Sequence, residues 1–373
     1  MHTRKLFKIA LYVFILVGFV LSFIAPWISH LIETGYSQAA YLWMIKPLSL
    51  FTGLFPFSVA EFMLIGLFLV ILYKAAQSVK NLIDRPRALR GTCKKIFVNS
   101  VVVLATLYLG FNMLYGLNYS RLPFAELAAL PLEPTSVGEL TELAVHLAER
   151  GNTIRELVAE DERGVMTLPG GIREMFDRAE LGYENAAMIY PKLGGGYGRP
   201  KGIIFSRLMS YSGITGVYFP FTAEANVNID LPHFWLPATT THEMAHQRGF
   251  AREEEANYIA YLTGTLHPDV DFQYSGVMLA LIHTMNALHP YDPEAYNEVR
   301  SKYSEGMDRD MRDLREYWAQ FEGPVKKTST RLNHTYLKAN RQQDGVHSYG
   351  RMVDLLLAEY RTGKMASLLN PKE

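Results

Sequence analysis

Cysteine is nearly absent from the sequence: Cys93 is the only one among 373 residues. A single thiol excludes an intrachain disulfide and a cysteine cage around a metal ion. A surplus of charge is missing as well, because 37 basic side chains balance 37 acidic ones. Without a basic excess, there is no electrostatic reason to expect nucleic acid as a partner. The glycine-rich loop "KLGGGYGRPKG" (192–202) lacks the lysine-serine or lysine-threonine ending of a phosphate-binding loop.

Three long apolar runs lie in the first third of the chain, over residues 6–27, 55–73 and 96–117. Each has about twenty residues, the length that a helix needs to cross the hydrocarbon layer of a bilayer. A cleaved signal peptide is the alternative for the first run, but no small-residue cleavage site follows "LSFIAPW". The pattern therefore predicts a membrane region over residues 1–118 with three transmembrane helices, and a lipid bilayer as a partner.

Basic residues predict the orientation of these spans. Arg4, Lys5 and Lys8 precede the first span, and seven lysines and arginines lie within residues 74–95, whereas the connection between the first two spans contains only Lys46. Cytoplasmic loops hold the excess of lysine and arginine. We therefore expect a multi-pass protein of the cell membrane with a cytoplasmic N-terminus and an extracytoplasmic C-terminal domain.

Glu61 falls inside the second run. A carboxyl group at that depth is costly and often functional. Because Glu61 lies only about two turns from the start of the run, a position at the membrane interface is an equally good interpretation.

Residues 119–373 have the pattern of an α+β domain. Helical spacing covers residues 136–151, where Ser136 is a plausible cap and Gly151 a plausible end, and again about 171–189. Short β-rich pieces, separated by glycine and proline, follow at residues 202–206, 216–222 and 225–229. From Leu236 the pattern is helical, with breaks at Gly249, near Pro268, at Pro290, near Pro324 and around Gly345. We expect a small sheet followed by a mostly helical remainder.

The segment "THEMAHQRGFAREEEANYIAYL" (241–262) holds the pattern most typical of a chemical site. On a helix, His242 and His246 lie on one face one turn apart, so both imidazoles can hold one ion at about 2.0–2.1 Å. Glu243 is about 100° further round the helix, where it misses the ion but reaches a water bound to it. This arrangement is typical of metal-assisted hydrolysis, with Zn²⁺ as the cofactor and Glu243 as the catalytic base.

Three plainer explanations compete with a metal site. One is a chance match, and another is a solvated charged helix. The third is a capping box of Thr240 and Glu243, which requires a helix that begins at Thr241. Pro237 is a natural first-turn residue and indicates an earlier start, and Gly249 lets the chain turn just after the second histidine.

A third ligand must come from another residue, since catalytic zinc usually takes three protein ligands and leaves the fourth position to water. Histidine is absent from the following turn, so Glu253, Glu254 and Glu255 are the candidates. A fourth protein ligand would mark a structural site instead, and His233 is near enough in sequence to supply one.

"HEMAH" resembles the metal helix of zincin metallopeptidases, and "EEEAN" is similar to the second-helix signature of their glutamate-zincin branch. By position, this resemblance implies that Glu253 is the third ligand and that Asn257 orients a ligand histidine. Two departures matter. Only six residues separate His246 from Glu253, whereas many of these peptidases place the glutamate helix much farther down the chain. The spacing of His246 and Gly249 is similar to that of metzincins, but their third histidine would fall at Arg252.

Nearly the whole chain also resembles the domain of unknown function 3810 family of bacterial membrane proteins. The three apolar runs, the segment "HEMAHQRGFAREEEANYIAYL" and the late segment "LKANRQQDGVHSYGRMVDLLLAEY" fit that family. The resemblance implies a zincin-like exported domain and indicates no substrate.

These features predict a membrane-anchored zinc metallopeptidase that hydrolyses peptides or proteins outside the membrane. Glu243 would accept the proton of the zinc-activated water and deliver it to the leaving amine. His347 and Tyr349 are candidates for holding the oxyanion, although packing and capping are simpler roles for them. The strand-like residues 216–229 can pair with an extended substrate or serve as buried sheet strands.

Two other functions stay open. One is a non-catalytic, zinc-containing cell-surface binding module. The other is an intramembrane metalloprotease, which the charges around the motif disfavour. The one later apolar stretch, residues 276–288, is also too short to cross a bilayer.

Overall fold

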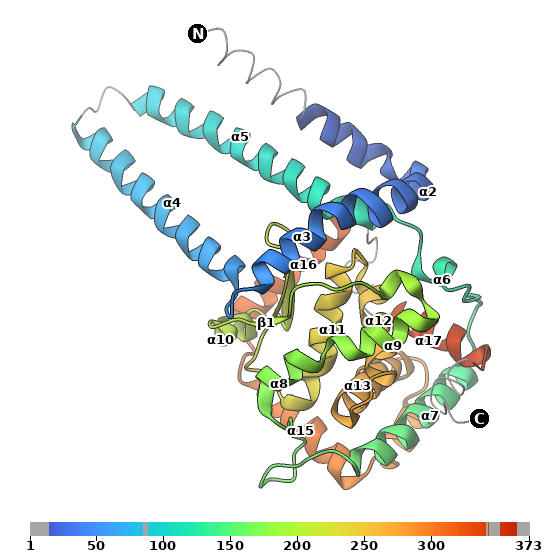
Figure 1. The fold of residues 1–373 in the computed structure, drawn as a ribbon. Helices are drawn as coiled ribbons and strands as arrows, with labels where there is room; N and C mark the ends of the chain where they lie inside the picture. Colours follow the sequence, from blue (N-terminus) through green and yellow to red (C-terminus); the bar gives the residue numbers. More distant parts are fainter. Residues whose placement is uncertain (1–14, 85–88, 341, 343–350, 364–373) are drawn as a thin grey trace.

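The computed structural model describes residues 15–84, 89–340, 342 and 351–363, and it is mostly helical with one small sheet (Figure 1). Long helices project from one end of a helical domain that contains the sheet. Within the described residues, three helical segments are long and apolar enough to cross a membrane: Ile15–Gly53, Val59–Asn81 and Ile96–Leu114. The three predicted apolar helices are therefore confirmed, and their length and composition are compatible with membrane anchoring.

The first segment differs from the prediction because the helix continues far beyond residue 27. It passes through short irregular turns of helix, η1 (Ala25–Ile28), α2 (Ser29–Leu31) and the π-helix η2 (Ile32–Ala40), into α3 (Tyr41–Gly53). Helix α3 then runs across the end of the domain from which the other two segments project (Figure 1). Residues expected to form a simple connection therefore form a helix against the domain.

The second and third segments form an antiparallel pair, α4 (Val59–Asp84) and α5 (Leu89–Leu114). Their far ends point away from the domain, on the same side as the start of the first segment (Figure 1).

The helical domain contains fifteen further helical elements within the described residues. They are η4 (Gly116–Ser120), α6 (Phe124–Leu127), α7 (Val137–Arg155), α8 (Gly171–Arg178), α9 (Glu180–Ile189), η5 (Pro191–Leu193), α10 (Ser206–Tyr211), η6 (His233–Trp235), α11 (Leu236–Gln247), α12 (Glu253–Thr265), α13 (Val270–Leu288), α14 (Pro293–Ser301), α15 (Glu305–Ala319), α16 (Pro324–Ala339) and α17 (Met352–Arg361).

In helix α7 one local sequence prediction is confirmed and another is wrong. Ser136 caps it as predicted, because its hydroxyl accepts the Glu139 N–H in a capping box. The predicted end at Gly151 is wrong, and the helix continues to Arg155. A Cβ at Gly151 would lie 3.1 Å from the Met307 side chain, so this glycine allows close packing against α15 instead of ending the helix.

The sheet has three strands in the order β1-β3-β2, formed by Lys201–Gly202, Glu224–Val227 and Gly216–Phe219. Strand β1 runs parallel to the central β3 and β2 runs antiparallel to it. The predicted strand over 202–206 is mostly wrong. The N–H groups of Ile204 and Phe205 donate to the Glu61 carboxylate, at 3.0 and 2.9 Å, instead of to a neighbouring strand.

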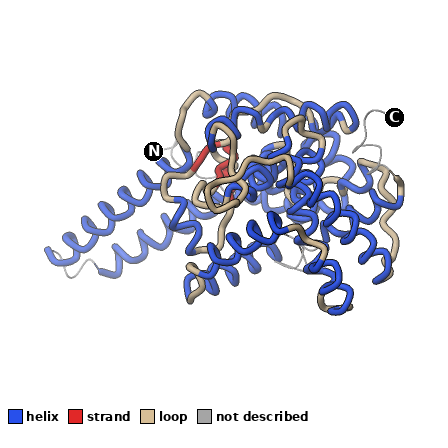
Figure 2. The backbone as a smooth tube through the Cα atoms, turned by 90° about the horizontal axis from the view of Figure 1, so that it is seen from below, coloured by secondary structure: helices blue, strands red, loops and turns tan. Residues whose placement is uncertain are grey.

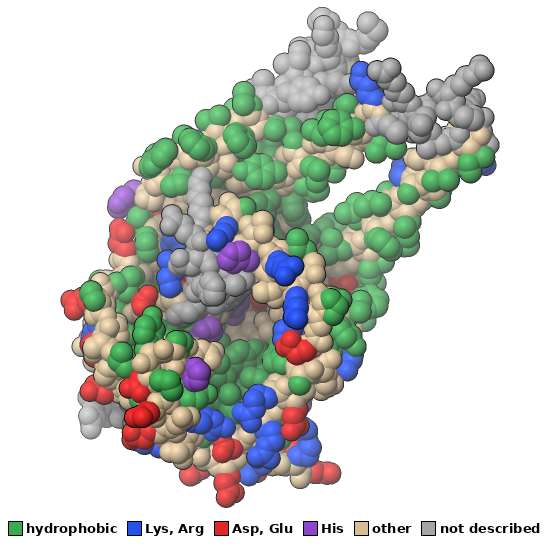
Figure 3. Space-filling model, turned by 180° about the vertical axis from the view of Figure 1, so that it is seen from behind, with side chains coloured by type: hydrophobic (Ala, Val, Ile, Leu, Met, Phe, Trp, Pro, Cys, Tyr) green, Lys and Arg blue, Asp and Glu red, His purple; other side chains and the backbone are tan. Residues whose placement is uncertain are grey.

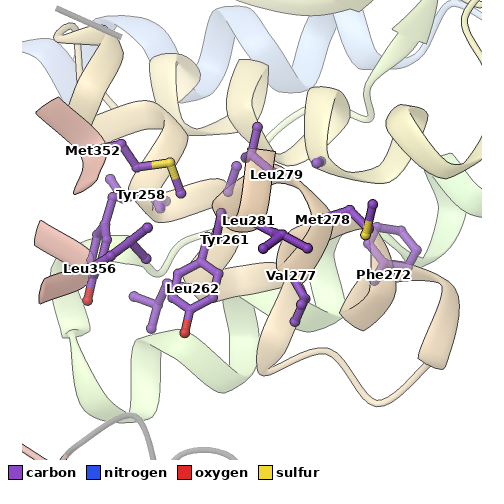
Figure 4. Close-up of a cluster of buried hydrophobic side chains, with 14 of the residues drawn as sticks. Tyr258, Tyr261, Leu262, Phe272, Val277, Met278, Leu279, Leu281, Met352 and Leu356 are labelled. Carbon is purple, nitrogen blue, oxygen red and sulfur yellow. The ribbon is translucent and has the colours of Figure 1, made fainter. Parts of the chain in front are cut away.

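The core of the domain surrounds α13, which packs against α7, α11, α12 and α17. Its fully buried residues include Val277, Met278 and Leu281, and they meet Tyr258 and Tyr261 of α12 (Figure 4). Burying each such side chain contributes about 1.5–3 kcal/mol. The site described below lies on the side of α11 and α12 that borders this core.

The strands lie near the end of the domain from which the helices project (Figure 2), and buried polar contacts attach the helices to the domain. The Glu224 carboxylate accepts the N–H groups of Val59 and Ala60 at the start of α4, and it pairs with Lys201 at 2.6 Å. Glu33 and Arg121 form a second buried pair, at 2.8 Å. Breaking a buried pair by removing one partner costs about 3–5 kcal/mol, so these contacts hold the two regions in a defined arrangement.

Candidate metal centre

Helix α11 begins at Leu236 with Pro237 in its first turn, as the sequence predicted. Thr240 lies inside the helix, where its hydroxyl donates to the Leu236 carbonyl, so Thr240 is not the N-cap of a capping box. Glu243 is 4% and His246 6% exposed, which contradicts a solvated charged helix. Gly249, at φ +82°, turns the chain directly after α11, as expected.

This turn brings α12 back against α11, and it places Glu253 beside the two histidines. The Nε2 atoms of His242 and His246 lie 3.2 and 3.5 Å from one Glu253 carboxylate oxygen. All three ligand atoms lie within 4.8 Å of one another. Two ligands about 2.0–2.1 Å from a tetrahedral zinc ion lie roughly 3.3 Å apart, so this donor set fits zinc.

The other nitrogen of His246 is held by two neighbours. Nδ1 lies 2.7 Å from the Phe250 carbonyl oxygen and 2.9 Å from the Tyr115 hydroxyl. Since a carbonyl oxygen only accepts, Nδ1 carries a proton, and Nε2 is the nitrogen that faces Glu253 and can bind a second proton or a metal ion. Tyr115 directly follows α5, so the third apolar helix contributes directly to the surroundings of a ligand.

The charges in the cluster support one another. Burial opposes protonation of His246, but the adjacent Glu253 carboxylate outweighs it and raises the pKa of His246 to about 9. Burial also opposes ionisation of Glu253, and the two imidazoles reverse this effect and hold the pKa of Glu253 well below its ordinary value. A cation, whether a proton or a metal ion, is therefore favoured between these side chains.

Glu243 occupies a different environment although it lies in the same helix. Burial raises the pKa of Glu243, and one of its carboxylate oxygens has no hydrogen-bond partner among the described residues. Its other oxygen lies close to the backbone of β2, where a Cβ on Gly216 would come within 2.4 Å of it. A carboxyl group with a raised pKa and a free oxygen is suited to taking up a proton.

The remaining glutamates have other partners. Glu254 accepts hydrogen bonds from Gln342 and Arg351, and Glu255 accepts from Arg252 and from the Phe124 N–H. Glu253 is thus the glutamate of the three whose carboxylate meets the histidines.

Asn257 lies one turn after Glu253 on α12, is 5% exposed and borders the same cavity. Its amide nitrogen has no hydrogen-bond partner among the described residues. His233 lies outside the ligand cluster, because its Nδ1 atom contacts the Thr167 hydroxyl and the Leu168 N–H. His347 and Tyr349 fall outside the described residues.

A cavity of about 970 Å³, lined mainly by apolar surface, contains the cluster. Polar residues that the sequence analysis did not single out also line it, among them Tyr115, His283 and Tyr336. Burial, and then the nearby His242, lowers the pKa of His283 to about 4, so this imidazole is neutral at neutral pH. An isolated histidine within the apolar residues 276–288 was the only signal for it in the sequence.

The fold and the site define a class of protein: a helical domain with a buried His-His-Glu cluster, attached to three apolar helices compatible with membrane anchoring. Residues 36–357 match the family described as "Protein of unknown function (DUF3810)", and the chain belongs to this family. No curated protein and no solved structure gives a significant match. The matched residues extend from η2 to α17, so they include α4 and α5 as well as the cluster.

Proposed function

We propose that this protein is a membrane-anchored zinc metallopeptidase whose active site lies outside the bilayer. The observation that carries the proposal is the convergence of His242, His246 and Glu253 beside Glu243 within one cavity. Bound by the first three side chains, zinc would supply a water of lowered pKa and would polarise a carbonyl group.

Glu243 performs the proton transfer in this proposal. Its carboxylate takes the proton of the attacking water and passes it to the leaving amine. His246 is oriented for its role by Phe250 and Tyr115, which hold Nδ1 protonated. Neutral His283 and the Tyr336 hydroxyl border the cavity and are the described candidates for stabilising the oxyanion.

Strand β2 supports a peptide as the substrate. It is an edge strand of the described sheet, and Gly216 and Val217 line the cavity next to Glu243. An extended peptide can add to such an edge through backbone hydrogen bonds. Helix α11 belongs to none of the candidate spans found among the described residues, so an intramembrane protease is disfavoured.

Two substitutions test the proposal with the full-length protein. His246→Ala should abolish stoichiometric zinc binding, whereas His289→Ala, an exposed histidine of the same domain, should retain about one zinc per chain. Glu243→Gln should keep the zinc and lower peptide hydrolysis by about 10²–10⁴-fold. The measurements are elemental analysis and turnover of a peptide library. A zinc-free wild-type protein under zinc-replete conditions, or an active Glu243→Gln variant, would refute the respective step.

A further inference from the structure

The cavity at the metal centre extends to a candidate membrane span. Its lining includes His242 and Glu253 at the cluster and also Glu61, Leu64 and Ile65 of α4. Leu64 lies within the span Val59–Asn81 and is 49% exposed. A molecule bound in this cavity can therefore contact the metal ligands and the first turns of a membrane helix together.

Exposed apolar side chains border the cavity on the domain side. Phe205, Leu208 and Leu332 line it, and they are 51, 63 and 67% exposed. Leaving large apolar side chains in water is unfavourable relative to burying them. Apolar surface likewise covers the projecting helices and continues onto the adjoining part of the domain, whereas charged side chains gather at the far end (Figure 3). Such a patch is typical of a site that meets lipid or an apolar ligand.

Glu61 fixes the level of this border relative to the membrane. Its carboxylate, in the first turn of α4, accepts the N–H groups of Ile204 and Phe205 and is 7% exposed. The sequence left its role open between function and the interface, and the structure assigns it to joining α4 and the loop before α10. The apolar border of the cavity is thus held beside the point where α4 enters the span.

Helix α3 has the character of an interfacial helix. Tyr41 and Ile45 are fully buried against the domain, while Trp43 and Leu50 are 80 and 52% exposed. A helix with one apolar face turned outward and a tryptophan on that face is typical of the boundary between lipid and water. Helix α3 therefore keeps this end of the domain against the bilayer surface.

We propose that the substrates are membrane-tethered polypeptides that are cut a few residues outside their anchor. The inference rests on the proposed function, whose substrate class it names. The anchor lies in the bilayer beside α4, the adjoining apolar residues contact Leu64, Phe205 and Leu208, and the extended backbone runs along β2 to the metal centre. A soluble peptide lacks the anchor that places its backbone at this opening.

The test uses the full-length protein in phosphatidylcholine vesicles and one peptide sequence that it cleaves, in three forms. The first form is soluble. The second carries an apolar helix of about twenty residues directly beside the scissile bond, and the third carries the same helix behind a long glycine-serine linker. Binding of each form is measured by energy transfer with the Glu243→Gln protein, and cleavage of each form is measured with the wild-type protein. The result therefore does not depend on turnover alone.

The directly anchored form should bind at least about tenfold more tightly than the long-linker form, because burying one further apolar side chain in the cavity increases the affinity by about this factor. Equal binding of the two anchored forms would attribute any gain to tethering alone and would overturn the inference. Inhibition by vesicle lipid without a gain for the anchored peptide would assign the cavity to lipid and would also overturn it. Cleavage that depends on Glu243 but not on the anchor would leave the proposed function intact, whereas a peptide library without any cleaved sequence would reject both.

Matched substitutions locate the effect. Leu208→Glu should remove most of the preference for the directly anchored form, because a carboxylate would stand where the apolar segment binds. Leu157→Glu is the control, since Leu157 is 65% exposed and does not line the cavity. Equal preferences in the two variants would contradict the assigned position.

Discussion

Helices α4 and α13 are both strongly apolar, yet their surroundings are opposite. Along the span of α4, only 11% of the most apolar stretch is buried in the protein, whereas Val277, Met278 and Leu281 of α13 are fully buried. Apolar side chains exposed over five or six turns require an apolar solvent, while those of α13 are covered by neighbouring helices. The difference shows that α13 is packed in protein, whereas the exposed apolar surface of α4 is compatible with membrane anchoring.

The candidate metal centre depends on both environments. His283 of α13 and Leu64 of α4 line the same cavity, and Tyr115, just after α5, contacts His246. A boundary drawn by hydropathy at residue 118 separates residues that belong to one site. The segment that carries the His-His-Glu cluster is thus best understood together with the turns of the apolar helices that border the same cavity.

The largest expected effect compares the two helices directly. Leu281→Ala in α13 should lower the free energy of unfolding by about 2–5 kcal/mol, because it leaves a cavity in a packed core. Leu69→Ala in α4, where Leu69 is 58% exposed, should cost less than about 1 kcal/mol, since detergent or lipid takes its place. Urea unfolding in mild detergent, followed by tryptophan fluorescence, measures both. Equal losses would mean that α4 is packed against protein.

A smaller effect measures the link between the two regions. Tyr115→Phe removes the hydroxyl that contacts His246 and should weaken zinc binding by about 10–100-fold. Tyr108→Phe, which alters a tyrosine of α5 paired with Ser22, is the matched control and should leave zinc affinity unchanged. Competition with a chelator gives both affinities. If the two variants match, the apolar helices only anchor the domain and do not tune the site.

The smallest effect, taken per pH unit, concerns the buried charges of the domain. His246 has its pKa raised to about 9, so the metal-free imidazole is protonated below that pH and zinc must displace the proton. The apparent dissociation constant for zinc should therefore fall about tenfold for each pH unit between pH 6 and 8. Calorimetric titrations at several pH values in buffers of different ionisation enthalpy report the affinity and the protons released. A flat profile would contradict the charge state inferred for the pair.

Local sequence was sufficient for several features of the site. The spacing of His242 and His246, the early start at Pro237 and the turn at Gly249 all depend on residues within one helix and its ends. The same holds for the cap at Ser136. Apolar runs of about twenty residues likewise predicted three helices without any knowledge of their packing.

Other features depended on partners far away in the chain. Glu253, Glu254 and Glu255 are equivalent in sequence, and only the close return of α12 against α11 makes one of them the neighbour of both imidazoles. Ile204 and Phe205 leave the sheet because Glu61, more than 140 positions earlier, accepts both of their N–H groups. Short-range patterns contain no information about such contacts.

The amino-acid sequence by itself determined the apolar helices, the spacing of His242 and His246 on one helix face and a small sheet within a mostly helical domain, because each follows from side chains a few positions apart. Only the tertiary structure decided which glutamate joins the histidines, that Tyr115 reaches one of them, and that the cavity opens beside α4. Those outcomes require segments distant in the chain to pack in one arrangement, and that packing is determined by the burial of the whole domain rather than by any single segment.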